Sequence, residues 1–419
     1  MAWIMLAIAI AAEIVATTSL KQSDGFSKLW PSVVTIIGYV IAFWLVGQAL
    51  KTIPVSVAYA IWSLGLILYR GEPILDNRQI GYVALLAVFA FAAPGMVLVR
   101  DPLRAYVLGS RIGVVLAAVA AAGMSLFVNE RVGIGGNAAV FAFVSAVGAI
   151  SAAIPLRNAP RWLPNGPQWL VLGIVAAMAS GTRAVIVVLP LFALAEIVIH
   201  LRRCSVRQQI YAIAGAVVAV IAVAGPATNV LSDRFTGMIE YYDTGDSTKW
   251  EDKFSADIRL AMWRGAATVI SQAPIVGVGA SAKMDMVREA AGPQGHMLDG
   301  FRHVHNTLLD ELLNDGVVGL ALLLAAFFSI FAYLWRAAAE AGMRRALIYF
   351  VIVGISYGML HNPLLHEMTI SSIMFFIAAL NATATSRLLA RRCALAPGAV
   401  TPRAGLWSGT APFCPSSAL

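Results

Sequence analysis

The sequence has 419 residues, of which 59% are hydrophobic and only 12% are charged, and its mean hydropathy is +0.78. This composition excludes an ordinary soluble domain and predicts an all-α polytopic membrane protein. The formal net charge of +8 comes from arginines between apolar stretches, so we assign it to membrane topology and expect no nucleic-acid partner. The three cysteines, Cys204, Cys393 and Cys414, are too few and too scattered for a disulfide framework or a metal site.

Apolar stretches that could cross a lipid bilayer, or nearly so, predict about twelve transmembrane helices. Their expected ranges are 2–20, 32–50, 54–69, 80–99, 106–128, 137–156, 168–181, 183–200, 209–231, 316–336, 345–361 and 368–390. The seventh and eighth form a tight pair that is interrupted at Gly181-Thr182-Arg183. Glu13 interrupts the first apolar run and no small-residue cleavage site follows, so we expect this segment to be retained as a span.

Positive residues gather after the even-numbered spans; examples are Arg100, Arg104, Arg157, Arg161, Arg202 and Arg203. Because positive charge accumulates in cytoplasmic loops, this pattern predicts that both termini are cytoplasmic. The long polar segment 232–315 is then one large periplasmic loop of a protein in the bacterial inner membrane. The segment 391–419 is rich in Ala, Pro, Gly and Ser, and we expect a disordered cytoplasmic tail there.

The N-terminal segment has a distinctive pattern. Glu13 lies within the first apolar run, Tyr39 lies within the second, and Ile53-Pro54 precedes Ala58-Tyr59-Ala60-Ile61-Trp62-Ser63. Residues 1–63 resemble the first half of a small multidrug resistance transporter. The resemblance implies that Glu13 binds protons or cationic drugs and that Tyr39, Tyr59 and Trp62 line the pocket. A carboxylate inside a membrane is costly, which independently makes Glu13 a candidate functional residue. The pattern stops at Leu64, where the family has a glycine.

Two arginines are expected on the periplasmic side. Arg183 lies in the hairpin between two apolar helices. Arg259 lies on the apolar face of an amphipathic helix that Ser255 is expected to cap, and Trp263 shares that face. Each arginine has an alternative interpretation. Arg183 could be an interfacial residue that extends its side chain to the headgroups, and Arg259 could pair with an internal carboxylate.

The third basic site is His305, with His303 nearby. Leu308, Leu309, Leu312 and Leu313 recur at helical spacing after it, so we expect a short amphipathic helix that carries the imidazole on its apolar stripe. Asn314-Asp315-Gly316 predicts the end of that helix, with a left-handed position at the glycine. The alternative is a histidine that only packs at the lipid headgroup boundary.

These residue types fit one reaction. Histidine accepts protons near neutral pH, and the planar fork of arginine holds a diphosphate through paired hydrogen bonds. Arg183, Arg259 and His305 on one side of the membrane therefore fit glycosyl transfer from a lipid diphosphate donor. The arginines would stabilise charge on the departing diphosphate, and the histidine would activate the acceptor hydroxyl. No Asp or Glu cluster has metal-binding spacing, so we expect no divalent metal and no other cofactor.

Residues 66–390 resemble the O-antigen ligase family. His305-Asn306, nine intervening residues and Gly316-Val317-Val318-Gly319 match the family's signature, and the settings of Arg183 and Arg259 are similar as well. The resemblance implies a metal-independent membrane glycosyltransferase that joins an undecaprenyl-diphosphate-linked glycan to lipid A core oligosaccharide in lipopolysaccharide biosynthesis. It implies His305 as the catalytic residue and Arg183 and Arg259 as diphosphate ligands. His303, Asn306 and Trp263 would support them.

The sequence leaves alternatives open. O-antigen polymerases and protein O-oligosaccharyltransferases share the same core motif. A function of another class is proton-coupled export of cationic compounds through Glu13, which would have little use for the large polar loop. At the N-terminus, the transporter-like segment either supplies helices equivalent to the first helices of a ligase or leaves the transferase compromised.

Overall fold

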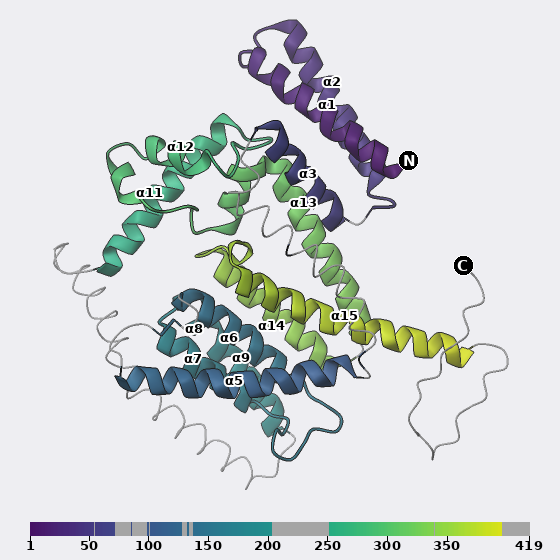
Figure 1. The fold of residues 1–419 in the computed structure, drawn as a ribbon, viewed down its shortest axis with the longest axis vertical. Helices are drawn as coiled ribbons and strands as arrows, with labels where there is room; N and C mark the ends of the chain where they lie inside the picture. Colours follow the sequence, from purple (N-terminus) through teal and green to yellow (C-terminus); the bar gives the residue numbers. More distant parts are fainter. Residues whose placement is uncertain are drawn as a thin grey trace.

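The computed structural model describes residues 1–53, 55–71, 85, 99, 101–127, 132–133, 137–202, 251–338 and 340–395. Every regular element in these ranges is a helix (Figure 1), which confirms the all-α prediction. The predicted spans at 80–99 and 209–231 lie almost entirely outside the described residues, as do the first part of the predicted periplasmic loop and most of the predicted tail.

The N-terminal segment forms a helical hairpin followed by a third helix that leaves it. Helices α1 (Ala2–Gln22) and α2 (Leu29–Ala49) pack closely, since a Cβ atom at Gly38 would lie 2.8 Å from that of Ala16. Helix α3 (Val55–Tyr69) turns away from the hairpin and runs beside α13 (Thr307–Ala337) (Figure 1). The N-terminal segment is therefore joined to the rest of the molecule through α3.

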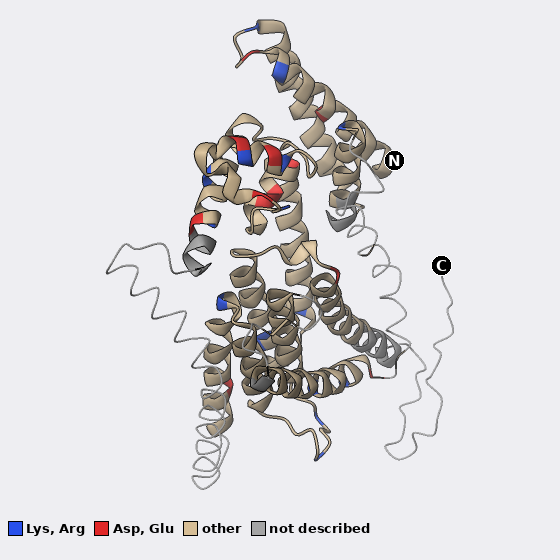
Figure 2. Cartoon of the chain, turned by 60° about the vertical axis from the view of Figure 1, so that its left-hand side comes forward, with Lys and Arg blue, Asp and Glu red and all other residues tan. Residues whose placement is uncertain are grey.

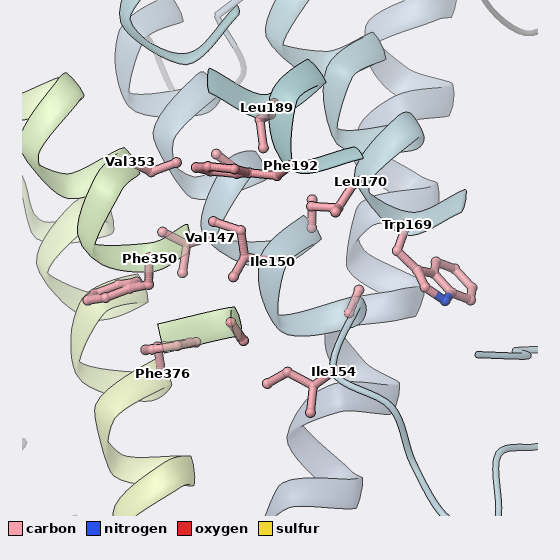
Figure 3. Packing of buried hydrophobic residues seen from close by; sticks show 14 of the residues in the cluster. Val147, Ile150, Ile154, Trp169, Leu170, Leu189, Phe192, Phe350, Val353 and Phe376 are labelled. Atoms are coloured by element: carbon pink, nitrogen blue, oxygen red, sulfur yellow. The ribbon is translucent and has the colours of Figure 1, made fainter. Parts of the chain in front are cut away.

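A helical bundle forms the largest apolar core. Its members are α5 (Pro102–Phe127), α6 (Ala138–Ala152), α7 (Gln168–Ser180), α8 (Arg183–Ile186), α9 (Val188–Leu201), α14 (Ala341–Gly358) and α15 (Glu367–Leu395). Val147 and Ile150 of α6 lie at its centre, between Leu170 of α7 and Phe350 of α14 (Figure 3). The rings of Phe350 and Phe376 stack with centroids 4.3 Å apart, which ties α14 to α15.

Six helices in the described part of the chain are long and apolar enough to cross a membrane. They are Ala2–Gln22, Leu29–Ala49, Pro102–Ser125, Arg183–Leu201, Thr307–Ala337 and Glu367–Thr385, and two shorter apolar helices are Ala138–Ala152 and Gln168–Ser180. The chain is a multi-pass membrane protein. The tail was expected to start at residue 391, but α15 continues to Leu395, so the first residues of the predicted tail are helical.

The polar segment before α13 folds into helices of its own. They are α11 (Glu251–Gln272), α12 (Lys283–Ala290) and the 3₁₀ helix η2 (Gly292–Leu298). Charged residues gather on this part of the molecule, whereas the bundle shows few of them (Figure 2). The predicted cap at Ser255 is wrong, because α11 already begins at Glu251. The sequence pattern did not anticipate α12 or η2.

Candidate active site

The site is organised around a break in α13. Gly316 has φ +65° and ψ −162°, a conformation that is accessible almost only to glycine, and the helix resumes after it. Both the positive φ and the helix end expected at this residue are confirmed: α13 consists of two helices that meet at the kink at Gly316, and the second runs on to Ala337. The loop that follows α11 fills the break. Val317 N donates to Pro274 O at 2.9 Å, and Val278 N donates to Leu313 O at 2.7 Å.

His305 lies in front of α13 and not on it. Asn306 is the N-cap, because its side-chain oxygen accepts from Leu308 N at 3.0 Å and from Leu309 N at 3.1 Å. His305 has φ +51°, a left-handed conformation that is uncommon for a residue with a side chain. The expectation that the imidazole sits on the apolar stripe of the helix is therefore wrong. A strained backbone before a capped helix places the ring instead.

Aromatic rings surround His305. The rings of His303 and His305 lie 4.3 Å apart between centroids, and those of Phe301 and His305 meet edge to face at 5.6 Å. His361, which follows α14, approaches His305 at 5.8 Å and stacks on Tyr357 at 4.7 Å. His305 Nδ1 is buried and has no hydrogen-bond partner among the described residues. The imidazole is thus held by ring contacts and leaves a nitrogen available for chemistry.

A buried ion pair fixes the backbone beside His305. Lys283 Nζ donates to Asp310 Oδ1 at 2.8 Å, and both side chains are almost fully buried. The same carboxylate accepts from Val304 N at 3.3 Å and from Asn362 Nδ2 at 3.0 Å. Asp310 therefore connects α12, the segment before His305 and the segment after α14. Shared hydrogen bonds of this kind compensate for part of the cost of burying the charges.

The pKa of His305 is lowered to about 3, mainly by burial; His303 and Arg259 add to this shift, and Asp310 opposes it. Burial also lowers the pKa of His303, with Asp310 raising it and Lys283 lowering it. Both rings are therefore neutral at neutral pH. A neutral imidazole can accept a proton, which an imidazolium cannot.

The structure brings Arg259 and Trp263 to His305. Arg259 lies on α11 close enough for its charge to act on the histidine. Trp263, one turn further along, donates from Nε1 to Val304 O at 3.1 Å and so ties α11 to the segment before His305. Met262 and Ala266 are fully buried on the side of α11 that packs against α12, η2 and the segment before α13. The apolar face predicted for this helix is confirmed.

Arg183 lies at the start of α8, which packs against α14. Gly181 ends α7 in the left-handed conformation, and Thr182 precedes α8, so the predicted interruption of this pair is confirmed. Arg183 is exposed at the first position of α8. Its neighbour Ala184 accepts a hydrogen bond at 2.7 Å from Ser356, which precedes Tyr357 on α14. Arg183 therefore lies near the end of α14 at which His361 contacts His305.

The transporter-like residues make contacts both within the hairpin and to α13. Glu13 is 1% exposed, and its carboxyl oxygens have no hydrogen-bond partner in the part of the chain that the structure describes. Tyr39 OH and Thr17 Oγ1 lie 3.0 Å apart within the hairpin. Tyr59 instead donates to Glu311 Oε1 on α13 at 2.8 Å. Trp62 is buried in an apolar cluster that includes Val318 and Leu322 of α13.

Sequence reasoning missed several residues of the site. Asp310 could have been noticed as an acidic residue among the leucines that follow His305. His361 and Tyr357 have the spacing of neighbours on a helix, but nothing linked them to His305 in sequence. Lys283 carried no signal of its own. Within the described ranges, no three His, Cys, Asp or Glu side chains are grouped so that they could hold a metal ion.

Comparison with known proteins agrees with both resemblances. Residues 1–70 match the family model described as Small Multidrug Resistance protein, and residues 169–324 match the one described as O-Antigen ligase. The second match contains Arg183, Arg259 and His305, together with α11, α12 and the break in α13. The fold and the family match together define a polytopic membrane protein with a region of the ligase or polymerase type.

Known relatives match the N-terminal part. The chain is 57% identical over 109 residues to the "Putative ethidium bromide resistance protein" of Escherichia coli, which is 24% of this chain and 95% of that protein. It is 57% identical over 67 residues to the quaternary ammonium compound-resistance protein QacE and 54% identical over 67 residues to the multidrug transporter EmrE, both of Escherichia coli. Each of these two matches covers 16% of this chain and 61% of the relative. Through this segment the chain belongs to the small multidrug resistance family, and its later residues carry the O-antigen ligase match.

Proposed function

We propose that the protein is a metal-independent membrane glycosyltransferase of the O-antigen ligase type. The observation that carries this proposal is the buried, neutral imidazole of His305, whose Nδ1 atom has no hydrogen-bond partner among the described residues and which lies within electrostatic range of Arg259. The donor would be a glycan on undecaprenyl diphosphate, and the acceptor would be lipid A core oligosaccharide.

His305 is the proposed general base. The acceptor hydroxyl gives its proton to the imidazole while the acceptor oxygen bonds to the anomeric carbon of the donor sugar. The bond between that carbon and the diphosphate oxygen breaks, and the diphosphate leaves with the electron pair. Arg259 and Arg183 stabilise the charge on the leaving group, as paired donors that are always protonated. Asn306, Trp263 and His303 hold the base in place.

Donor binding also explains how a histidine with so low a pKa can act as a base. A weak base accepts protons poorly, so His305 is a poor catalyst in the empty site. The positive charge of Arg259 contributes to this suppression. A bound diphosphate neutralises that charge and adds a negative one nearby, which raises the pKa of His305. The base therefore gains strength when the donor is present.

The proposed site faces the periplasm of a bacterial inner membrane, with both termini in the cytoplasm. The support is the distribution of positive residues along the sequence. A cysteine at Thr268, an exposed position of α11, tests this in a background without the native cysteines. We expect the cysteine to react with an impermeant thiol reagent in intact spheroplasts. Reaction only after lysis would overturn the orientation.

The decisive functional test is expression of the chain in a Gram-negative strain without its O-antigen ligase. We expect lipopolysaccharide capped with O-antigen. Longer glycans on the undecaprenyl carrier without capping would indicate a polymerase, and glycan on protein would indicate an O-oligosaccharyltransferase. With the purified protein, transfer should continue in the presence of a chelator. Loss of transfer on chelation, restored by added metal, would overturn the metal-free mechanism.

A second candidate function is export of cationic compounds. The observation in its favour is the buried carboxyl group of Glu13 in a segment that is closely similar to known resistance proteins. Tyr59 argues against the usual arrangement, since it donates its hydroxyl to Glu311 of α13. Ethidium resistance in a strain without its own exporters tests this function. We expect no resistance above that of a Glu13→Gln control.

A further inference from the structure

Two complementary stripes of residues join the transporter-like segment to the helix of the candidate site. Tyr59, Ser63 and Leu66 recur at helical spacing along α3, and Arg70 follows one turn later. On α13 the facing residues are Glu311, Asp315, Val318 and Leu322, with the same spacing. Residues at this spacing lie on one face of a helix. Tyr59 and Ser63 therefore meet Glu311 and Asp315, and Leu66 meets Val318 and Leu322.

Tyr59, Ser63 and Arg70, the polar residues of this stripe, each have a defined partner on or beside α13. Tyr59 OH donates to Glu311 Oε1 at 2.8 Å, and Ser63 Oγ donates to Asp315 Oδ2 at 2.8 Å. Arg70 Nη1 lies 3.6 Å from Asp315 Oδ1, and Nη2 of the same arginine donates to the carbonyl oxygen of Val276. The carboxyl groups of Glu311 and Asp315 are thus held by side chains from the segment that matches the small multidrug resistance family.

These contacts are buried. Ser63 is 0% exposed, Asp315 is 1% exposed and Glu311 is 6% exposed. A buried carboxyl group that loses its hydrogen-bond donor is left with an unmet desolvation cost. We call the contact of Tyr59, Ser63, Leu66 and Arg70 with α13 the seam. Leu66 extends it into the apolar cluster that contains Val318 and Leu322. The seam is a built interface and not a chance contact between two helices.

The seam holds the part of α13 that connects His305 to the helix break. Glu311 lies one turn after Thr307, the first residue of the helix, and Asp315 directly precedes Gly316. Val276 belongs to the loop that fills the break, so Arg70 touches both sides of it. Movement of these turns would displace Asn306 and, with it, His305. A displacement of about 1 Å can reduce the rate of an enzyme by about a hundredfold.

We infer that α3 of the transporter-like segment is a structural part of the transferase, and that Tyr59, Ser63 and Arg70 are positioning residues that set α13 and so His305. This inference rests on the proposed function. Because α3 packs directly on α13, the transporter-like segment contributes to the structure of the candidate site. It is therefore more than an extension that leaves the transferase unaffected.

The test compares two tyrosines of the same helix. Tyr59→Phe removes the hydroxyl that reaches Glu311, whereas Tyr69→Phe removes one that lies 2.9 Å from Thr18 Oγ1 of α1. With the purified full-length chain, lipid-linked donor and core acceptor, we expect Tyr59→Phe to lower kcat about tenfold with little change in either KM. Tyr69→Phe should keep the wild-type kcat. Ser63→Ala should resemble Tyr59→Phe, and Ser63→Thr, which keeps a hydroxyl, should recover most of the loss.

Two further measurements separate positioning from general stability. In a Glu311→Leu background, Tyr59→Phe should lower kcat much less, because the acceptor of the Tyr59 hydroxyl is already absent. Amide exchange of residues 307–315 should be faster in Tyr59→Phe than in Tyr69→Phe, even where both proteins melt at the same temperature. If the wild-type chain transfers glycan and the two tyrosine variants match it in both kcat and exchange, this inference is overturned and the proposed function stands. A wild-type chain without transfer would overturn both.

Discussion

The bundle and the layer around the start of α13 are stabilised in different ways. The bundle buries interlocking apolar side chains, and its buried arginine, Arg111, satisfies its donors with backbone carbonyls and Asn165. The layer around His305 instead relies on a buried ion pair, a helix cap and residues with positive φ. Conformational strain and buried charge reduce stability and are retained where they position a functional group. The difference therefore marks the layer as the part of the molecule that positions His305.

The ion pair of Lys283 and Asp310 gives the largest expected effect on stability. Lys283→Met leaves a carboxylate buried without its cation, and we expect a loss of about 3–5 kcal/mol in unfolding free energy. Asp285→Asn is the matched control, because the side chain of Asp285 is 79% exposed in its pair with Arg288. We expect that change to cost less than about 1 kcal/mol. Thermal unfolding in detergent measures both, and equal shifts would show that the buried ion pair contributes no more to stability than an exposed one.

The break at Gly316 gives the next effect. A Cβ atom there would collide with the backbone of Ile275, and the φ of +65° disfavours any other residue. We expect Gly316→Ala to cost about 2 kcal/mol or more and to lower transfer. Gly354→Ala on α14 is the control, since nothing lies within 4 Å of the added carbon. It should be neutral or slightly stabilising. A tolerated Gly316→Ala would show that the break can close without loss.

Some features of both regions could be predicted from the sequence, and others could not. The spans at α1, α2, α5 and α15 followed from apolar length, and the positive φ at Gly316 followed from its turn residues. The position of His305 did not, because its leucine pattern is equally compatible with a histidine on the helix or before it. The ion pair of Lys283 and Asp310 joins residues 27 positions apart. No periodic pattern reports such a contact, which only the tertiary fold creates.

The pH dependence of transfer should reveal the coupling between the donor and His305. A base works only when it is deprotonated, so activity falls as the pH drops through its pKa. In the free protein burial holds the pKa of His305 at about 3, so kcat/KM should stay flat well below pH 6.5. In the donor complex the pKa is raised, so kcat should begin to fall at a higher pH than kcat/KM. Acid limbs that coincide would contradict this coupling.

Glu13 gives the smallest expected effect. It belongs to α1, whereas the hydrogen bonds to Glu311 and Asp315 described above are donated by Tyr59 and Ser63 of α3, so Glu13→Gln should leave glycan transfer unchanged. The contrast with Tyr59→Phe would localise the contribution of the N-terminal segment to α3. The amount of capped lipopolysaccharide on gels measures this in cells. A large loss with Glu13→Gln would show that the hairpin also contributes to the site.

The central claim is that His305 takes the proton from the acceptor, and substitution of this residue tests it most directly. Transfer is measured with purified protein, lipid-linked donor and lipid A core acceptor, and expression and donor binding are compared in parallel. Positioned proton transfer typically contributes about a hundredfold to ten-thousandfold in rate. We predict losses of this size for both His305→Ala and His305→Leu, with donor binding largely retained. Near-normal transfer by His305→Leu, which keeps an apolar side chain among the surrounding rings, would contradict the catalytic role and leave His305 as a packing residue.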